Sequence, residues 1–332
     1  MKIRTLARRG AATAALSALA AGGLVGLPAP AHASVNDGLV RVEAQFHDDN
    51  SCIVDGGTPS PPDTTWTDDG VAVSQSTASS GTVTGVTPED VAHLSVKASA
   101  SIAAARIGSG PATIDAMMKI SADAGVPAPA TTCAGHAFAS SRLQGTFTLA
   151  QPRWATITMT NQGSGREVDL EVYLSNPDNT VELQVNGRGH GSVTALLPAG
   201  PVELGIEGDL DTYTNDPATR RASLDGRIKI EIQPLGFASA ATGKGQSYAQ
   251  LGARSCPAGT VGVGITKKAA RQAKSVQVTV NGRKAVTLKG KKLKKRALVL
   301  PAAASSRADV AARITLKNGK VVDVRRSYLA CS

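Results

Sequence analysis

One segment of the 332-residue chain has a composition that predicts ligand binding, because six of the eight residues from 289 to 296 are cations. They are Lys289, Lys291, Lys292, Lys294, Lys295 and Arg296. Lys and Arg at this density attract phosphate and carboxylate groups, so the segment predicts an anion-binding site around a turn. The alternative is structural, since lysines at a sheet edge also prevent aggregation.

Charge is divided along the chain. Residues 34–245 carry 13 Lys and Arg against 24 Asp and Glu, a net charge of −11. Residues 246–332 carry 19 Lys and Arg against two acids, Asp309 and Asp323, a net charge of +17. We therefore expect the basic part to bind an anionic cell-envelope polymer or polysaccharide. Opposite charge also predicts an alternative, in which it docks on the acidic part of the same or another copy.

A dedicated nucleic-acid domain is not expected in the basic part. Tyr248 and Tyr328 are its only aromatic residues. Surfaces that bind single-stranded nucleic acid usually carry several aromatic side chains on which bases stack.

Closely spaced acids are the candidate metal ligands. Asp209 and Asp211 are the first choice, because they follow an alternating apolar run and are expected in the loop after a strand. Carboxylates in such loops can hold a structural Ca²⁺. The clusters at 48–50 and 68–69 are further candidates, and none of these segments completes an EF-hand loop. Solvated loop acids are the alternative, and no other cofactor is expected.

Known catalytic motifs are missing, so no catalytic residue is assigned. The sequence has neither a His-Glu-x-x-His zinc motif nor a Gly-x-Ser-x-Gly nucleophile turn. His47 beside Asp48 is a common surface pair. Glycosidase carboxylates can be far apart in sequence, which leaves a glycan hydrolase open. Trp66 and Trp154 could stack on sugars, which leaves a carbohydrate-binding module open.

The first 33 residues have the pattern of a signal peptide. A basic start is followed by an apolar stretch from about 11 to 27 and by Ala31-His32-Ala33 before Ser34. We expect cleavage after Ala33 and a secreted or cell-surface protein without a transmembrane segment. An even number of cysteines in an exported chain predicts disulfides. The four are Cys52, Cys133, Cys256 and Cys331, and Cys52–Cys133 with Cys256–Cys331 is favoured because each pair lies within one expected domain.

The elements that position these residues are strands. Apolar residues alternate with polar ones, as in 167–174, a pattern typical of strands with one buried face. Asn-Gly pairs at 186–187, 281–282 and 318–319 predict hairpins. The sequence thus predicts an all-β fold of two antiparallel β-sandwiches. Their expected bounds are 34–236 for the larger acidic domain, 237–250 for a flexible linker and 251–332 for the smaller basic domain.

Three features of the smaller domain carry a resemblance: the hairpin at 280–282, the Lys-Asn-Gly-Lys hairpin at 317–320, and Tyr328-x-x-Cys331 with the earlier Cys256. The domain resembles immunoglobulin-like β-sandwich modules of exported actinobacterial proteins, over about 80 of 332 residues, and lacks the tryptophan of antibody domains. The larger domain resembles a secreted bacterial jelly roll in its strand pattern and its run 143–149. Together these features predict a non-enzymatic protein anchored to anionic envelope polymers.

Overall fold

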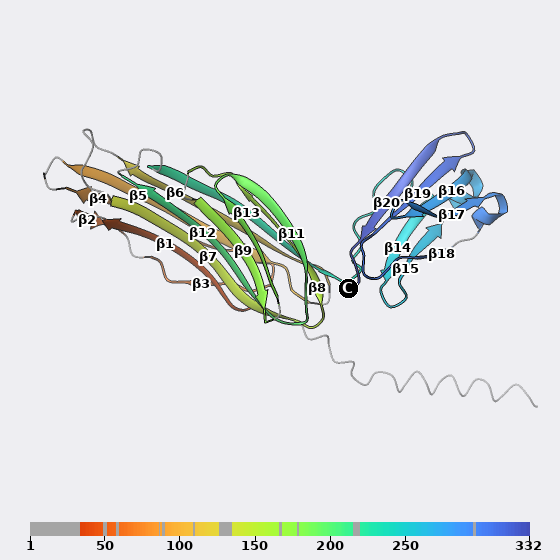
Figure 1. The fold of residues 1–332 in the computed structure, drawn as a ribbon, viewed down its shortest axis with the longest axis horizontal. Coiled ribbons are helices and arrows are strands. Elements are labelled where there is room, and N and C mark those ends of the chain that lie inside the picture. The colour runs from red at the N-terminus through yellow and green to blue at the C-terminus, as the bar shows by residue number, and fades with distance from the viewer. Residues whose placement is uncertain are drawn as a thin grey trace, which may run out of the picture.

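The computed structural model describes residues 34–332, except 49–51, 58–59, 86, 88–89, 109, 126–134, 166–167, 178, 215–219 and 295–296. The expected signal peptide and Cys133 lie outside the described residues. Figure 1 shows two bodies of strands that meet at a narrow joint, with the C-terminus at that joint. Almost all of the regular secondary structure in the described chain is antiparallel strand, which confirms the all-β prediction. Of the helices in the described part, none combines the length and apolar composition of a membrane crossing.

The larger domain is a sandwich of two sheets. In order across the six-stranded sheet lie β10 (Asn179–Asn186), β9 (Val168–Asn176), β12 (Gly200–Tyr213), β7 (Gly135–Leu149), β1 (Asn36–Asp48) and β3 (Thr64–Thr65). In order across the seven-stranded sheet lie β11 (Gly189–Leu197), β8 (Arg153–Asn161), β13 (Arg221–Pro234), β6 (Ala112–Gly125), β5 (Val91–Ala104), β4 (Val73–Thr84) and β2 (Ile53–Gly56).

Strands β6 to β13 have the topology of a jelly roll. One sheet contains the order β6-β13-β8-β11 and the other β7-β12-β9-β10, so consecutive strands repeatedly cross between the sheets. Strands β1 to β5 widen both sheets on the same side. Every second side chain enters the core, as in β5, where small Ala alternates with polar Ser. The jelly-roll-like expectation is therefore met by the strand order.

The smaller domain packs a three-stranded sheet on a four-stranded one. The first contains β14 (Ala249–Ser255), β15 (Thr260–Ile265) and β18 (Ala297–Pro301). The second contains β17 (Arg283–Lys289), β16 (Ala273–Val280), β19 (Ala308–Leu316) and β20 (Val321–Tyr328). The helix α1 (Lys267–Gln272) joins β15 to β16, and the 3₁₀ turn η1 (Gly290–Lys294) joins β17 to β18.

The seven strands are arranged as in immunoglobulin-like sandwiches, with one difference. In constant-type immunoglobulin domains the fourth strand belongs to the sheet of the first, second and fifth strands. Here the fourth strand, β17, pairs instead with β16. The hairpin between them turns at Asn281 and Gly282, whose φ angles of 50° and 75° suit a tight two-residue turn.

The Asn186-Gly187 pair does not form the predicted hairpin. It joins β10 to β11, which belong to different sheets, so the turn carries the chain from one face of the sandwich to the other. Gly187 has a φ of 67°, so the pair supplies the positive φ that the prediction used. The neighbouring strands, and not the turn residues, determine that the chain changes sheet.

The segment 237–250, expected as a flexible linker, lies along β20. Bridges pair Ala238 with Tyr328 and Thr242 with Arg325, and the Ser239 amide donates to the Ser327 carbonyl at 2.8 Å. Ala238 packs against the core of the smaller domain. This segment therefore has the composition of a flexible linker but forms an ordered edge of the smaller domain.

The joint between the domains is made of hydrogen bonds. The carbonyl of Ala330 accepts from the Gly236 amide at 3.0 Å and from Trp154 Nε1 at 2.9 Å. Cys256 and Cys331 form a disulfide beside Gly236, so that the C-terminal segment is held at this point. No ion pair joins the two domains among the described residues. Opposite charge is therefore not what holds them together here, and docking on another copy stays a prediction.

Candidate functional site

The candidate anion-binding segment lies at the end of the smaller domain where several strands start or stop together. In register, β16 begins beside the end of β19 and of β17, while β15 ends beside the start of β14 and of β18. The connections at this end are α1, η1, the hairpin 317–320 and the segment 244–248. The expected cationic turn is thus one of four basic segments at one end.

Two buried residues anchor these connections. Ala269 of α1 and Leu293 of η1 lie in the core of the smaller domain. Thr266 caps α1, because its hydroxyl accepts from the Ala269 amide at 3.2 Å. The Lys317 amide donates to the Gln272 carbonyl at 2.9 Å and ties the hairpin to the helix. With the apolar residues turned inward, the charged residues of each short segment point outward.

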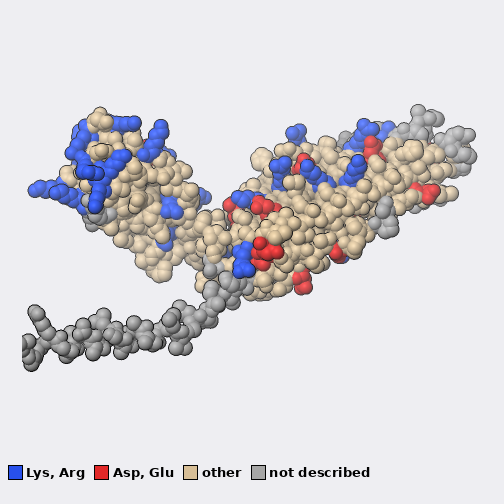
Figure 2. Space-filling model, turned by 180° about the vertical axis from the view of Figure 1, so that it is seen from behind, with Lys and Arg blue, Asp and Glu red and all other residues tan. Residues whose placement is uncertain are grey.

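We call this end the basic pole and define it by eleven exposed cations. They are Lys244, Lys267, Lys268, Arg271, Lys274, Lys289, Lys291, Lys292, Lys294, Lys317 and Lys320. Lys295 and Arg296, which the sequence also predicts as ligands, lie outside the described residues. No acid belongs to these segments in the described chain. In Figure 2 the blue side chains gather on the part of the smaller domain that lies away from the larger one.

Most of these cations make no ion pair within the described part of the chain. Lys268 is held in place, because its Nζ lies 4.7 Å from the centre of the Tyr248 ring and 3.3 Å from Ser247 Oγ. The pole is therefore a set of solvated charges with one fixed member. The net charge of the domain and its predicted hairpins carry the signal for cations beyond 289–296, but only that run is contiguous in the sequence.

Asp209 and Asp211 do not lie in a loop. They project from the second half of β12, which continues to Tyr213 because Gly208, Leu210 and Thr212 keep the alternation on the buried side. Short acid spacing suggested a loop, while the strand simply exposes every second residue. Among the described residues, no group of three His, Cys, Asp or Glu side chains could hold a metal ion. A Ca²⁺ site at Asp209 and Asp211 therefore stays a prediction.

These two residues belong to what we call the acidic face: Asp169, Glu171, Glu207, Asp209 and Asp211 on neighbouring strands β9 and β12. Asp209 is directly opposite Asp169 in register, and Glu207 is opposite Glu171. Burial, reinforced by Glu207, raises the pKa of Asp209 to about 6. Burial also raises the pKa of Glu171, with added repulsion from Glu182 and Glu207.

Arg142 is the cation that counters the acidic face. It extends from β7, and its Nε lies 3.0 Å from Glu207 Oε1. Its charge lowers the pKa of Asp209 in part, against the larger effects of burial and Glu207. Farther along the sheet three rings from β1, β7 and β12 stack, His47 on His136 at 4.8 Å and His136 on Tyr213 at 5.2 Å. His47 Nε2 is 3.1 Å from Gln45 Oε1, and the side chain of Asp48 is outside the described residues.

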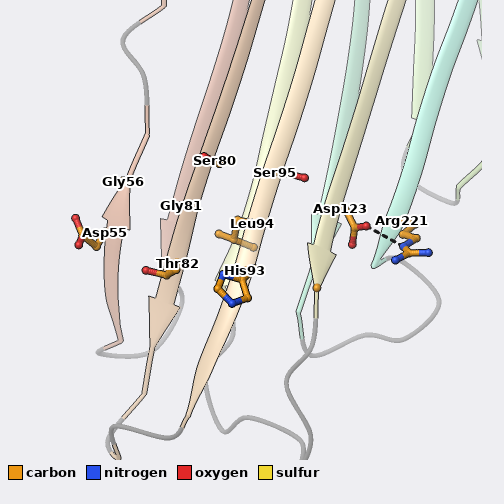
Figure 3. A pocket seen from close by; sticks show the side chains of 11 residues that line it. Asp55, Gly56, Ser80, Gly81, Thr82, His93, Leu94, Ser95, Asp123 and Arg221 are labelled. Atoms are coloured by element: carbon orange, nitrogen blue, oxygen red, sulfur yellow. Dashed lines mark hydrogen bonds and ion pairs between the residues drawn. The ribbon is translucent and has the colours of Figure 1, made fainter.

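An open groove of about 560 Å³ lies at the tip of the seven-stranded sheet. Figure 3 shows His93 and Thr82 at its centre, with Asp55 on one side and the ion pair of Asp123 with Arg221 on the other. Asp55 and Asp123 belong to β2 and β6, three strand spacings or about 14 Å apart. Glycosidase carboxylates lie about 5 to 9.5 Å apart, so this groove does not hold such a pair.

The two tryptophans do not form a sugar-stacking surface. Trp66 is 2% exposed and donates from Nε1 to the Gln144 carbonyl at 2.9 Å. Trp154 is partly buried at the joint, where Ala330 holds its indole N–H. Both rings have structural partners, which removes the observation that would have supported a carbohydrate-binding module.

Of the two disulfides predicted from the sequence, one lies wholly within the described residues. Cys256 and Cys331 are bonded to each other within the smaller domain, as favoured from the sequence. Cys52 is disulfide-bonded, and its expected partner Cys133 lies outside the described residues.

Comparisons with known proteins add little. No family model and no curated protein matches the sequence. Among solved structures, the adhesin domain of Epf from Streptococcus pyogenes aligns with 67% of this chain and 76% of its own, at 11% identity and a TM-score of 0.20. A likeness at that TM-score carries no argument about function.

Proposed function

We propose that the protein is a secreted or cell-surface, non-enzymatic adhesion protein that is anchored by its smaller domain to anionic envelope polymers. The observation that carries the proposal is the basic pole, with eleven exposed cations from several segments at one end of one domain. A concentrated cationic surface attracts a polymer with repeated anionic groups, and each neutralised charge adds salt-dependent affinity. The pole faces away from the larger domain, which leaves it accessible to a polymer (Figure 2).

The use of lysine rather than arginine supports a flexible polymer as ligand. Ten of the eleven cations are Lys, whose ammonium group acts as a mobile point charge without the fixed fork of a guanidinium. Such a surface attracts phosphate or carboxylate at many relative positions. The pole thus supplies attachment, and selection among anions requires other residues.

The test is retention of the purified chain on immobilised heparin and on isolated cell envelopes as salt is raised. The variant K291Q/K292Q/K294Q should elute earlier, and the slope of log affinity against log salt should fall by about 2 to 3. The matched control K97Q/K119Q/K229Q removes the same charge from exposed positions on the larger domain and should elute with the wild type. A wild-type chain that passes through both at about 50 mM salt overturns the proposal.

A further inference from the structure

The outer face of the four-stranded sheet holds an open groove of about 590 Å³, which we call the trough. Ala311 lies at its centre, between Thr279 on β16 and Arg325 on β20. Because the central side chain is a single methyl group, its larger neighbours form a hollow around it. The volume is within the range of small-ligand sites, which is about 300 to 1,000 Å³.

Charged groups of both signs line the trough. In the next row of the sheet, Arg313 lies between Gln277 and Asp323. The guanidinium groups of Arg313 and Arg325 and the carboxylate of Asp323 have no side-chain partner within the described part of the chain. These groups are thus free to bind a ligand, although opposite charges lie on adjacent strands.

The two acids of the smaller domain indicate the class of ligand more clearly than its many cations do. Residues 246–332 contain two acids among 19 cations, and both, Asp309 and Asp323, line this one groove. Asp309 is fixed by Ser327, whose Oγ donates to its Oδ1 at 2.5 Å. Carboxylates in a binding site repel a ligand that offers only anionic groups, so they do not suit a site for such a polyanion. Carboxylates and guanidiniums together suit a ligand that offers both an anion and hydroxyl donors.

We propose that the trough binds one uronic-acid unit of an acidic polysaccharide, which rests on the proposed function and specifies its ligand. Arg313 and Arg325 donate to the sugar carboxylate, the geometry for which guanidinium groups are best suited. Asp323 and Asp309 accept from ring hydroxyls, and Thr279 completes the polar wall. The basic pole attracts the chain by charge, and the trough selects the sugar.

The test compares two probes of equal charge, a short oligogalacturonate and a linear polyphosphate, by titration calorimetry at fixed salt. The wild type should favour the oligogalacturonate by about tenfold, the worth of one charged hydrogen bond or more. The variant A311L fills the trough without changing charge and should abolish the preference while polyphosphate binding is retained. D323N should reduce the preference and leave polyphosphate binding equal or tighter.

A charge-matched pair separates recognition from attraction. R313Q/R325Q should lose the preference, whereas R283Q/K284Q, on exposed positions of β17 outside the trough, should keep it. Equal binding of both probes by the wild type, or an unchanged preference in A311L with a native circular-dichroism spectrum, overturns the trough alone. If the wild type binds neither the oligogalacturonate nor the polyphosphate, both the trough proposal and the proposed function are overturned.

Discussion

The acidic face and the basic pole place like charges close together in two different ways. The acidic face holds its carboxylates on adjacent strands in register, so Asp169 and Asp209 directly oppose each other. The basic pole holds nine of its eleven cations on short connections and the other two, Lys274 and Lys289, at strand ends, and all eleven side chains are exposed. Strands fix the spacing of their side chains, while loop ends let charges spread apart.

The difference shows in the proton affinity of the acids. Like charges directly opposite on a sheet are destabilising, and partial burial adds the cost of desolvation. Burial is the largest cause and the charge of Glu207 on the same strand the second, and with a smaller contribution from Asp169 on the opposite strand they raise the pKa of Asp209 to about 6. The face therefore stores unfavourable energy near neutral pH, whereas the pole should hold more charge at little cost to folding. The following changes test this contrast.

Removal of the Cys256–Cys331 disulfide should have the largest effect. The bond joins residues 75 positions apart, and in the chain-entropy model such a loop is worth about 4 kcal/mol. Without the bond the unfolded chain of the smaller domain is less constrained, so the free energy of unfolding of this domain should fall. C256A/C331A should shift its unfolding, followed by circular dichroism in urea, by about that amount.

Trp66 fluorescence supplies the internal control when C256A/C331A is compared with its parent in a W154F background, because Trp154 is the other tryptophan of the chain and contacts Ala330 beside Cys331. The residue is buried in the larger domain, and the smaller domain contains no tryptophan. The transition that it reports should move little in C256A/C331A. A loss under about 1 kcal/mol in the smaller domain would show that its core and basic pole do not depend on the disulfide.

Replacement of Asp209 should be stabilising at neutral pH. Because its folded pKa is about 6 and its ordinary value is 3.8, the folded state binds the proton more tightly between these values. The contribution of this carboxyl to stability is greatest below about pH 4 and is lost as pH rises through about 6. After allowance for solvent screening, D209N should raise the free energy of unfolding at pH 7 by about 1 to 2 kcal/mol.

The gain in D209N should vanish at about pH 3, below the ordinary pKa of 3.8, where the carboxyl is mostly protonated in both the folded and the unfolded state. E231Q is the matched control, since Glu231 projects from the opposite sheet and pairs with Lys229 at 3.1 Å. Its effect should stay within about 0.5 kcal/mol at either pH. Urea unfolding at the two pH values measures both. An equal gain in the two variants would mean that the acidic face is not strained.

W154F, at the joint between the domains, should lower the free energy of unfolding by about 1 kcal/mol. It keeps most of the ring and removes the hydrogen bond that the indole N–H donates to the Ala330 carbonyl. The smaller domain should lose that stability, measured by circular dichroism. W66F removes a similar bond to Gln144 and should weaken only the larger domain. If W154F leaves the smaller domain unchanged, the indole bond does not couple the two charged bodies.

Local patterns determine much of this fold and could be interpreted from the sequence. Polar and apolar alternation predicts the strands. The turn at Asn281 and Gly282 forms a hairpin because the strands on either side of it, β16 and β17, pair directly with each other. The pair at 186–187 fails because sheet membership depends on distant strands. The segment 237–250 has the composition of a linker, yet the free edge of β20 orders it, and composition alone does not show that edge.

The candidate site divides in the same way. The run 289–296 is visible because its charges are contiguous, whereas α1 and the hairpin 317–320 reach the pole only through strand register. The sequence predicts Asp209 in a loop because closely spaced acids are typical of loops. The exposed side of a strand gives the same spacing, since every second residue points to solvent. The trough depends on Ala311, and a single alanine has no signal until its neighbours across the sheet are known.

The smallest effect on stability should come from the variant that most weakens anion binding. K291Q/K292Q/K294Q removes three charges from exposed positions on η1 and keeps the buried Leu293 that anchors it. Its free energy of unfolding should stay within about 0.5 kcal/mol of wild type, with a slight gain at low salt as repulsion falls. Urea unfolding at low and physiological ionic strength measures this. A gain above that of D209N, which removes one charge, would show that loop ends crowd like charges as severely as a sheet face does, and the contrast between the two regions would be lost.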